Sequence, residues 1–441
     1  MATVVVFGAG MVARPIVRYL LDQPDVTVVI ATRTISKAER MIAGHPRGIA
    51  KSLDVKDMKA VEEEVRNADL VVSLLPYTYH VAVAEFCITH KKHLVTTSYV
   101  SDGMRALDGK AKKTGVMLLN ECGLDPGIDH MSAMRIIHDV GRRGGTVVSF
   151  RSSTGALPAH EANTNPFGYK FSWSPRGVLL ASRNSAKWLE DGTEVDVPGE
   201  RLFENYYIVD VPDAGSFENY PNRNSVPYKE IYGLTDAGTV YRGTLRMTGW
   251  CETMRRIVAL GWLTEEPVKN FKGKTYGDMT RHLIGAGADD DLAAATAEFL
   301  GIDTFATVIK RLEWLGLFSN RPLPGDRNNP LDYMNVLTLE KMSMAPGDRD
   351  MIVMHHEFLA EFSGGGRELL TSTLVDYGIP DGDTSVARTV ALPAAIAVKM
   401  ILNGKIALTG CHIPVTPEIY DPILDELEGM GIKFIERKNK V

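Results

Sequence analysis

The amino-acid sequence predicts an α/β protein in which a doubly wound parallel sheet is followed by a second, α+β domain. Three observations support this prediction. Strand-like apolar runs alternate with helical segments over residues 1–130, a glycine-rich turn follows the first apolar run, and the alternation stops beyond His138. Repeated strand–helix–strand units place parallel strands side by side, with helices on both faces of the sheet.

The first strand–helix–strand unit spans Thr3 to Thr34. Val4–Phe7 is an unbroken apolar run, which is typical of a strand buried on both faces, and the glycine-rich turn follows it directly. A segment with helical apolar spacing then leads to a second apolar run, Val26–Ala31. This order within about thirty residues predicts a Rossmann-type dinucleotide-binding unit.

Each small residue of the turn has a structural reason. Gly8 permits the tight turn out of the strand, Gly10 lets the backbone approach a pyrophosphate, and Ala13 allows the helix to pack closely on the strand. The helix N-terminus then presents free N–H groups to the phosphates. A cofactor site is therefore favoured over a turn that serves packing alone.

The residues after the second strand distinguish between the two nicotinamide cofactors. NAD sites place Asp or Glu there to bind the ribose hydroxyls, whereas this chain has Thr32, Arg33 and Thr34. The nearest acid, Asp25, lies before the strand, at the wrong end. A guanidinium and two hydroxyls suit a 2′-phosphate, so NADP is favoured over NAD. The alternative is that Arg33 is a solvated surface residue.

The composition is that of an ordinary globular protein. The 441 residues are 44% hydrophobic and 24% charged, with a formal net charge of -6, so no nucleic-acid partner is expected. The four cysteines are scattered and form no CxxC pair, which favours no metal site and a reducing, cytoplasmic location. The apolar stretch Val390–Leu402 contains Pro393 and Lys399 and is too short to span a membrane.

We expect residues 1–130, completed by 385–441, to form the NADP-binding domain. Its strands are predicted at Val4–Phe7, Val26–Ala31, Ile49–Val55, Ala68–Leu75, Leu94–Thr97 and Val116–Asn120. Asp54, at the end of the third strand, either contacts the adenine or caps the next helix, which begins near Asp57. The apolar segment Ser385–Leu402 predicts a helix that packs back on this domain, and Glu436–Lys440 is expected to be a frayed end.

Residues 131–384 are expected to form the substrate-binding domain, with a mixed sheet and a helical insertion at about 252–330. Its strands are predicted at Thr146–Ser153, Tyr206–Val211, Thr239–Met247 and Met351–Phe358. The segment Gly285–Ala288 resembles the glycine turn but follows no strand, so we do not expect it to bind phosphate.

Several motifs occur together in a fixed order along nearly the whole chain. They are Ser73–Tyr77 (SLLPY), Thr97–Tyr99 (TSY), Asn120–His130 (NECGLDPGIDH), Asn165–Ser174 (NPFGYKFSWS), Pro221–Arg223 (PNR) and Arg242–Arg246 (RGTLR). With these motifs the chain resembles the saccharopine dehydrogenase family, in its glutamate-forming branch. The resemblance implies that 2-aminoadipate 6-semialdehyde and glutamate condense to an imine, which a nicotinamide hydride reduces to saccharopine. Fungal members use NADP, in agreement with Thr32–Thr34.

The resemblance also implies which residues contact the cofactor. Around the turn they are Gly8, Ala9, Gly10, Met11 and Val12; at the 2′-phosphate, Thr32, Arg33 and Thr34; at the adenine, Asp54 and Val55; at the ribose and nicotinamide, Leu75, Thr97, Ser98, Leu124, Asp125, Pro126 and Trp173. The implied substrate contacts are Ser98, Tyr99, Asp125, Arg223, Thr244, Leu245 and Arg246. The resemblance further implies a homodimer that associates through the sheet of the second domain.

The chemistry of the reaction suits these residue types. Saccharopine carries three carboxylates, and the guanidinium groups of Arg223 and Arg246 are suited to bind them, although either arginine can instead form an ion pair that supports a loop. Imine formation needs proton transfers, so Asp125 and Tyr99 are candidate catalytic residues. Asp125 also fits a turn role before Pro-Gly. His130 and Lys170 are further candidates for moving protons, with a structural role favoured for His130.

Two departures from the fungal pattern leave the exact amine and aldehyde open. Fungal members have YCGGLPAP where this chain has residues 153–160, so Thr154 takes the place of a cysteine, and Met247–Trp250 differ from the usual aromatic and Gln residues. One alternative is a related imine reductase of the carboxynorspermidine type, which acts on a diamine. Another is a cofactor-binding regulatory protein without turnover.

Overall fold

The computed structural model describes all 441 residues, which divide into two compact units. The first contains Met1–Thr146 and Gly382–Ile435, and the second contains Val147–Asp381 and Glu436–Val441. The division therefore differs from the predicted boundary at residue 130. Helix α7 (Ile128–Arg142) belongs to the first unit, and the last residues of the chain belong to the second.

The first unit contains a seven-stranded sheet in the order β15-β6-β5-β4-β1-β2-β3, and every pairing within it is parallel. Its strands are β1 (Ala2–Phe7), β2 (Val26–Thr32), β3 (Gly48–Ser52), β4 (Leu70–Ser73), β5 (His93–Thr96), β6 (Met117–Leu119) and β15 (Gly410–His412). The six predicted strands are all present, and β15 extends the sheet beyond them. The strand order reverses at β1, between β2 and β4, and ligands of such sheets bind at this reversal.

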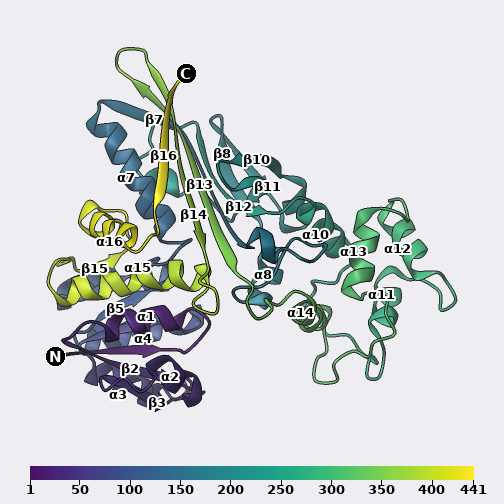
Figure 1. Ribbon diagram of the computed structural model, residues 1–441, viewed down its shortest axis with the longest axis horizontal. Helices are drawn as coiled ribbons and strands as arrows, with labels where there is room; N and C mark the ends of the chain where they lie inside the picture. Colours follow the sequence, from purple (N-terminus) through teal and green to yellow (C-terminus); the bar gives the residue numbers. More distant parts are fainter. The chain divides into compact units, whose positions relative to one another are not determined.

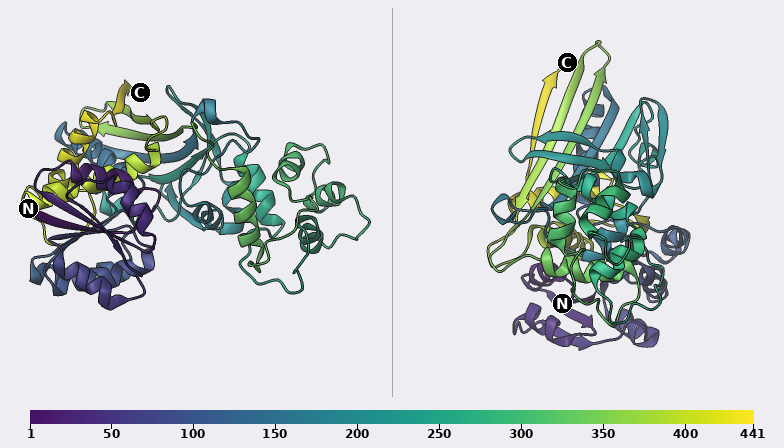
Figure 2. Two further views of the ribbon diagram at one scale, coloured as in Figure 1. Left: turned by 60° about the horizontal axis from the view of Figure 1, so that its bottom comes forward. Right: turned by 90° about the vertical axis from the view of Figure 1, so that its right-hand side faces the viewer.

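Helices lie on both faces of this sheet (Figure 2, left). They are α1 (Ala13–Leu21), α2 (Ile35–Ile42), α3 (Met58–Asn67), α4 (His80–Thr89), α5 (Asp102–Arg105), α6 (Asp108–Thr114), α7, α15 (Ser385–Leu402) and α16 (Pro417–Gly429), with a 3₁₀ turn at Tyr77–Tyr79. As predicted, α15 returns to the first unit, where it packs beside α1 (Figure 1). It is the one helix long and apolar enough to cross a membrane, but 72% of it is buried inside the protein, as in a core helix.

The second unit contains a nine-stranded sheet in the order β10-β11-β12-β7-β13-β14-β16, with β8 and β9 added beside β12. The bounds are β7 (Gly145–Pro158), β8 (Ala186–Glu190), β9 (Thr193–Val197), β10 (Tyr207–Val211), β11 (Gly215–Pro221), β12 (Thr239–Arg246), β13 (Asp350–Phe362), β14 (Arg367–Tyr377) and β16 (Phe434–Lys440). Because β7 and β12 are parallel while β11–β12 and β13–β14 are antiparallel, the sheet is mixed, as predicted.

The prediction of a frayed end at Glu436–Lys440 is wrong. These residues lie in β16, which runs along β14 at the edge of the second sheet (Figure 2, right). Most of its side chains are exposed, so the segment has no apolar pattern from which a strand could be predicted. Backbone pairing with the edge of β14 gives it strand structure instead.

The helices of the second unit are α8 (Pro175–Ala181), α9 (Tyr228–Ile231), α10 (Trp250–Ala259), α11 (Tyr276–Ile284), α12 (Leu292–Leu300), α13 (Thr307–Leu315) and α14 (Pro330–Lys341), with 3₁₀ turns at His160–Ala162 and Gly199–Glu204. Helices α10–α14 form the predicted helical insertion. Gly285 ends α11 in a left-handed conformation, and Asp291 caps α12 by accepting a hydrogen bond from the backbone N–H of Ala294 at 3.0 Å. This segment therefore links two helices, as expected.

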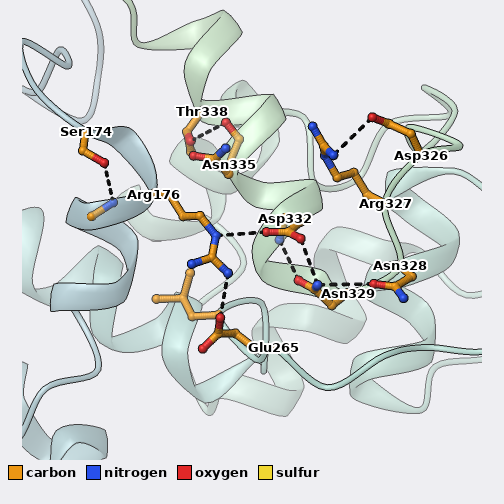
Figure 3. Close-up of polar contacts among 12 residues, drawn as sticks. Ser174, Arg176, Glu265, Asp326, Arg327, Asn328, Asn329, Asp332, Asn335 and Thr338 are labelled. Atoms are coloured by element: carbon orange, nitrogen blue, oxygen red, sulfur yellow. Dashed lines mark hydrogen bonds and ion pairs between the residues drawn. The ribbon is translucent and has the colours of Figure 1, made fainter. Parts of the chain in front are cut away.

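Arg176 ties α8 to the helical insertion (Figure 3). Its Nε donates to Asp332 Oδ1 of α14 at 3.2 Å, and its Nη2 donates to Glu265 Oε1 at 2.6 Å. Asn329 caps α14 by accepting a hydrogen bond from the backbone N–H of Asp332 at 2.8 Å. The start of α8, which immediately follows Trp173, is thereby fixed against α14.

Candidate active site

A cavity of about 350 Å³ opens beside the carboxyl ends of β1, β2, β3 and β4. Its volume is within the usual range for a small-molecule site. Of the predicted cofactor contacts, it is lined by Gly8, Ala9, Gly10, Thr32, Arg33, Thr34, Asp54, Val55 and Leu75; its other lining residues are Ala31, Lys37, Lys56, Leu74, Pro76 and Tyr79. The structure thus brings together the predicted phosphate and adenosine contacts.

The glycine turn has the geometry that a bound pyrophosphate requires. Gly8 has a φ of +104°, and a Cβ there would lie 3.1 Å from the carbonyl oxygen of Leu74. At Gly10 a Cβ would meet no atom within 4 Å, so the backbone borders open space. Helix α1 has no capping side chain and no acidic residue in its first turn, so no side chain competes with an anion there. The N–H of Ala13 donates to the carbonyl oxygen of Gly10 at 3.2 Å and Pro15 has no N–H, which leaves the backbone N–H of Arg14 for the anion.

Three cations line the adenosine end of the cavity, namely Arg33, Lys37 and Lys56. None of them forms an ion pair with a carboxylate of the chain. These features fit a dinucleotide that carries a 2′-phosphate. Arg33 was predicted from the sequence, whereas neither lysine was; Lys37 lies in the first turn of α2, four residues after Arg33.

Asp54 is the one acidic residue among those lining the cavity. Its Oδ1 accepts a hydrogen bond from the backbone N–H of Lys56 at 3.0 Å. The cap of α3 is Asp57, whose Oδ1 accepts from the backbone N–H of Ala60 at 3.2 Å. Of the two roles considered for Asp54, capping of α3 is therefore performed by Asp57 instead.

A buried histidine supports the residues that follow β5. His80 Nδ1 lies 2.9 Å from Ser73 Oγ, and its Nε2 lies 2.9 Å from Ser98 Oγ and 3.4 Å from Thr96 Oγ1. Burial lowers the pKa of His80 to about 4, so the ring is neutral near pH 7. A role for His80 was not predictable from the sequence, because its hydroxyl partners are brought to it only where neighbouring strands end.

The two candidate catalytic residues are in direct contact. The Tyr99 hydroxyl donates a hydrogen bond to Asp125 Oδ1 at 2.9 Å. The loop that carries Asp125 is held by Glu121, whose Oε1 accepts from the backbone N–H of Val100 at 2.9 Å and whose Oε2 lies 2.7 Å from His130 Nε2. His130 is fully buried, which agrees with the structural role favoured for it.

Several predicted cofactor contacts lie outside the lining of the cavity. In the first unit these are Met11, Val12, Thr97, Ser98, Leu124, Asp125 and Pro126. Trp173 belongs to the second unit, where its ring lies against Gly177 at the start of α8. The cavity therefore includes the predicted adenosine contacts and the turn residues Gly8, Ala9 and Gly10, but not Met11, Val12 or the predicted nicotinamide contacts beyond Leu75.

In the second unit, Arg246 is a buried cation without an acidic partner. Arg246 is only 5% exposed. Its guanidinium carbon lies 4.9 Å from the Tyr169 ring centre and 5.5 Å from that of Trp250. Nη1 donates to the carbonyl oxygen of Leu245 at 2.8 Å, while Nε has no hydrogen-bond partner. No carboxylate lies within ion-pair distance of Arg246.

Two hydroxyl residues share the face of the sheet on which Arg246 lies. Thr244 precedes Arg246 by two residues in β12 and pairs with Thr154 of β7. The hydroxyl of Thr154 is buried and has no hydrogen-bond partner. Because side chains alternate along a strand, Leu245 points to the opposite face, where it is fully buried. Only its backbone is thus available to a ligand on the Arg246 face.

Arg223 and Lys170 differ from Arg246 in their surroundings. Arg223 lies in the loop after β11, exposed, with a φ of +55°, and its carbonyl oxygen accepts from the backbone N–H of Lys187 at 2.9 Å. Lys170 is buried and its Nζ donates to Asp348 Oδ2 at 2.6 Å. Because its ammonium is engaged in this buried ion pair, a structural role is favoured for Lys170 over proton transfer.

Comparison with known proteins gives matches over the whole chain. The family profile described as saccharopine dehydrogenase NADP binding domain matches residues 4–119, and the saccharopine dehydrogenase C-terminal domain profile matches 123–432. The chain is 40% identical to saccharopine dehydrogenase [NADP(+), L-glutamate-forming] of Schizosaccharomyces pombe, covering 99% of each protein. It is 36% identical to mitochondrial alpha-aminoadipic semialdehyde synthase of Bos taurus, where the match covers 98% of this chain and 47% of that longer protein. The structure of apo saccharopine dehydrogenase (L-Glu forming) from Saccharomyces cerevisiae superimposes with a TM-score of 0.90, at 38% identity over the full length of both chains.

Proposed function

Since this chain belongs to the saccharopine dehydrogenase family, we propose that it catalyses the NADP-dependent, L-glutamate-forming reaction of lysine metabolism. In the reductive direction, glutamate and 2-aminoadipate 6-semialdehyde lose one water to form an imine. Addition of a hydride and a proton to the C=N bond then gives saccharopine. The reverse direction oxidises saccharopine and hydrolyses the imine.

The first unit is the NADP-binding domain. The turn at Gly8 and Gly10, with the N-terminus of α1, would hold the pyrophosphate, and Arg33 would bind the 2′-phosphate. When NADPH is bound, it supplies the hydride for the reduction. The contribution of the chain is to fix the dinucleotide at the strand ends, where the glycines permit close approach of the backbone.

The observation that carries the substrate assignment is the buried guanidinium of Arg246. A carboxylate bound there would provide the acceptor that Nε lacks and would neutralise a charge enclosed by Tyr169 and Trp250. The hydroxyl of Thr154 supplies a further donor on the same face. An amine substrate with a carboxylate, such as glutamate, fits this environment better than a diamine, which would place a second cation in it.

Tyr99 and Asp125 form the pair that we assign to proton transfer. Imine formation requires a proton for the departing hydroxyl and removal of a proton from the nitrogen. The Tyr99 hydroxyl, which donates to Asp125 Oδ1, fixes the orientation of that carboxylate, so that it can take up and return a proton without rearrangement. His80, which bonds to Ser98 Oγ, fixes the hydroxyl of the residue before Tyr99.

The test is the consumption of NADPH, followed by its absorbance, with 2-aminoadipate 6-semialdehyde and either glutamate or a diamine. We expect turnover with glutamate only. Faster turnover with a diamine would favour the related imine reductase, and binding of NADPH without turnover on any pair would favour a regulatory protein. Arg246→Gln is expected to raise the KM for glutamate and leave the Kd for NADPH unchanged, which separates the two sites.

The assembly follows from the resemblance and from one exposed edge. We propose a homodimer that associates through the sheet of the second unit. Tyr206, just before the edge strand β10, and Tyr207 and Ile208 within it are 39%, 36% and 52% exposed, so the monomer leaves apolar side chains in water along this edge. Sedimentation equilibrium is expected to give twice the mass of the chain. A single-chain mass at micromolar concentration would rule out this assembly.

A further inference from the structure

The adenosine end of the cavity holds more positive charge than the predicted Arg33 alone provides. Lys37 lies in the first turn of α2 and Lys56 lies after β3, and both line the same cavity as Arg33. All three are without a carboxylate partner, and α2 has neither a capping side chain nor an acidic residue in its first turn. Elsewhere in the same unit, Lys51 is paired with Glu64 at 2.8 Å and Lys112 with Asp108 at 2.8 Å.

The charges at this end match those of the group to be bound. Three cations against the single carboxylate of Asp54 leave two net positive charges. A phosphate monoester above its second pKa, near 6, carries about two negative charges. Arg33 alone would leave roughly one of them without a counter-charge inside the cavity. The ammonium of Lys37, which forms no ion pair and lines the same cavity as Arg33, is placed to supply the second.

We propose that Lys37 is a specificity-determining residue that shares the 2′-phosphate of NADP with Arg33. Arg33 offers a planar pair of N–H donors, and Lys37 adds a compact point charge with three donors. Lys56, on the β3 side of the cavity, offsets the charge of Asp54. The selection of NADP over NAD therefore depends on two side chains that start from the same strand–helix junction, and removal of either one leaves part of the preference.

The alternative is that Lys37 is a solvated lysine whose position beside the cavity has no consequence for binding. Arg40 provides the matched control, because it is an exposed cation of the same helix α2 that does not line the cavity. A general effect of removing positive charge from α2 would appear equally in Lys37→Gln and Arg40→Gln. A specific contact would appear only in Lys37→Gln.

The experiment measures binding without turnover. The Kd values of NADPH, NADH and 2′-AMP are determined by fluorescence titration or calorimetry for the wild type, Lys37→Gln, Arg33→Gln, the double variant and Arg40→Gln. The probe 2′-AMP carries the 2′-phosphate without the pyrophosphate or the nicotinamide, so it reports on this end of the cavity alone. Thermal unfolding of each variant without ligand shows whether the fold is intact.

We expect Lys37→Gln to weaken NADPH and 2′-AMP by about tenfold to a hundredfold, the range for loss of one charge-assisted hydrogen bond, and to leave NADH unchanged. The double variant should bind NADPH and NADH with similar Kd values. The dependence of NADPH binding on salt should be shallower in Lys37→Gln than in the wild type, because one charge pair is lost.

Two results would overturn the proposal. One is an unchanged Kd of Lys37→Gln for 2′-AMP and NADPH, and the other is an equal loss for NADPH and NADH. Because the readout is binding of 2′-AMP, it does not depend on the reductase activity proposed above. If the wild type consumes NADPH with glutamate and Lys37→Gln binds NADPH and 2′-AMP as the wild type does, this inference is refuted and the proposed activity stands.

Discussion

Arg246→Met should make the free protein more stable while removing its ability to bind the substrate carboxylate. Methionine is similar in length to arginine and apolar, so it can occupy the space beside Tyr169 and Trp250 without a charge. In the wild type the guanidinium is buried, forms no ion pair and leaves Nε without a hydrogen-bond partner, which is unfavourable in the absence of ligand. The buried carboxylate of Glu218, opposite Arg246 across β11–β12, instead accepts from the backbone N–H groups of Gly249 and Cys251. We therefore expect that Arg246, which is proposed to bind the substrate carboxylate, lowers the stability of the unliganded protein.

The magnitude follows from the opposing contributions around Arg246. Replacement of a buried ion pair by apolar side chains is often stabilising by about 1–4 kcal/mol, and we use this range for the single guanidinium of Arg246. Part of this gain is offset, because the substitution also removes the hydrogen bond to the Leu245 carbonyl oxygen and the attraction of the cation to the two aromatic rings. A cation over an aromatic ring contributes about 0.5–2 kcal/mol. We therefore expect Arg246→Met to gain about 1–2 kcal/mol, a rise in Tm of roughly 2–8 °C for a unit of this size.

The assay is thermal unfolding of the protein without substrate, together with calorimetric titration of saccharopine. Arg151→Met provides the contrast, because Arg151 lies in β7 of the same sheet but is paired with Glu190. That variant leaves Glu190 without its guanidinium partner and should lower the Tm. An Arg246→Met protein that is less stable than the wild type, or one that still binds saccharopine normally, would show that the guanidinium has a structural role and would refute the reasoning.

Three further predictions concern the first and second units separately. His80 binds a proton far less readily when folded, with a pKa of about 4 against 6.5 when unfolded, so its contribution to stability is complete above pH 6.5 and is lost as the pH falls toward 4. His80→Gln should make this acid loss smaller, by about 3 kcal/mol at most, in urea unfolding curves from pH 4 to 7. Tyr99→Phe should lower kcat by about 10²-fold or more and leave the Kd for NADPH unchanged, as measured by stopped-flow reduction and titration. Arg176→Met leaves Asp332 and Glu265 unpaired and should lower stability by only about 1 kcal/mol, since all three side chains are partly exposed; a loss of NADPH binding in this variant would contradict its purely structural role.

The first unit was predictable because each of its strands is a buried apolar run that alternates with a helix. Strands β8, β9, β11, β14, β15 and β16 were not predicted, and the last two of them lack this signal. β15 has three residues, Gly410–His412, and pairs only with β6, which lies far away in the sequence. β16 is polar and acquires its structure from β14. Short or polar edge strands depend on partners that the local sequence does not reveal.

Site residues were predictable where the residue type and its position in the sequence indicate one function. They were not predictable where the function depends on which residues surround them in the fold. Arg33 after the second strand indicated a 2′-phosphate, and the structure places it on the cavity wall. Lys37, Lys56 and His80 were missed, because an exposed lysine and an apolar-helix histidine are common in any protein. Their roles depend on their surroundings in the fold. The two lysines line the cavity without forming an ion pair, and the histidine lies between two hydroxyl groups.

The late position of α15 and β15 in the sequence, near residues 385–412, affects how the first unit folds during translation. The NADP-binding sheet starts with β1 at residue 2, yet its helix α15 and its edge strand β15 are translated only after residues 147–381, which make up most of the second unit. Until then, the nascent first unit exposes the apolar surface that α15 will cover, and contacts this distant in sequence form slowly. The emerging chain is therefore expected to expose an aggregation-prone apolar surface until residues 385–402 have been translated.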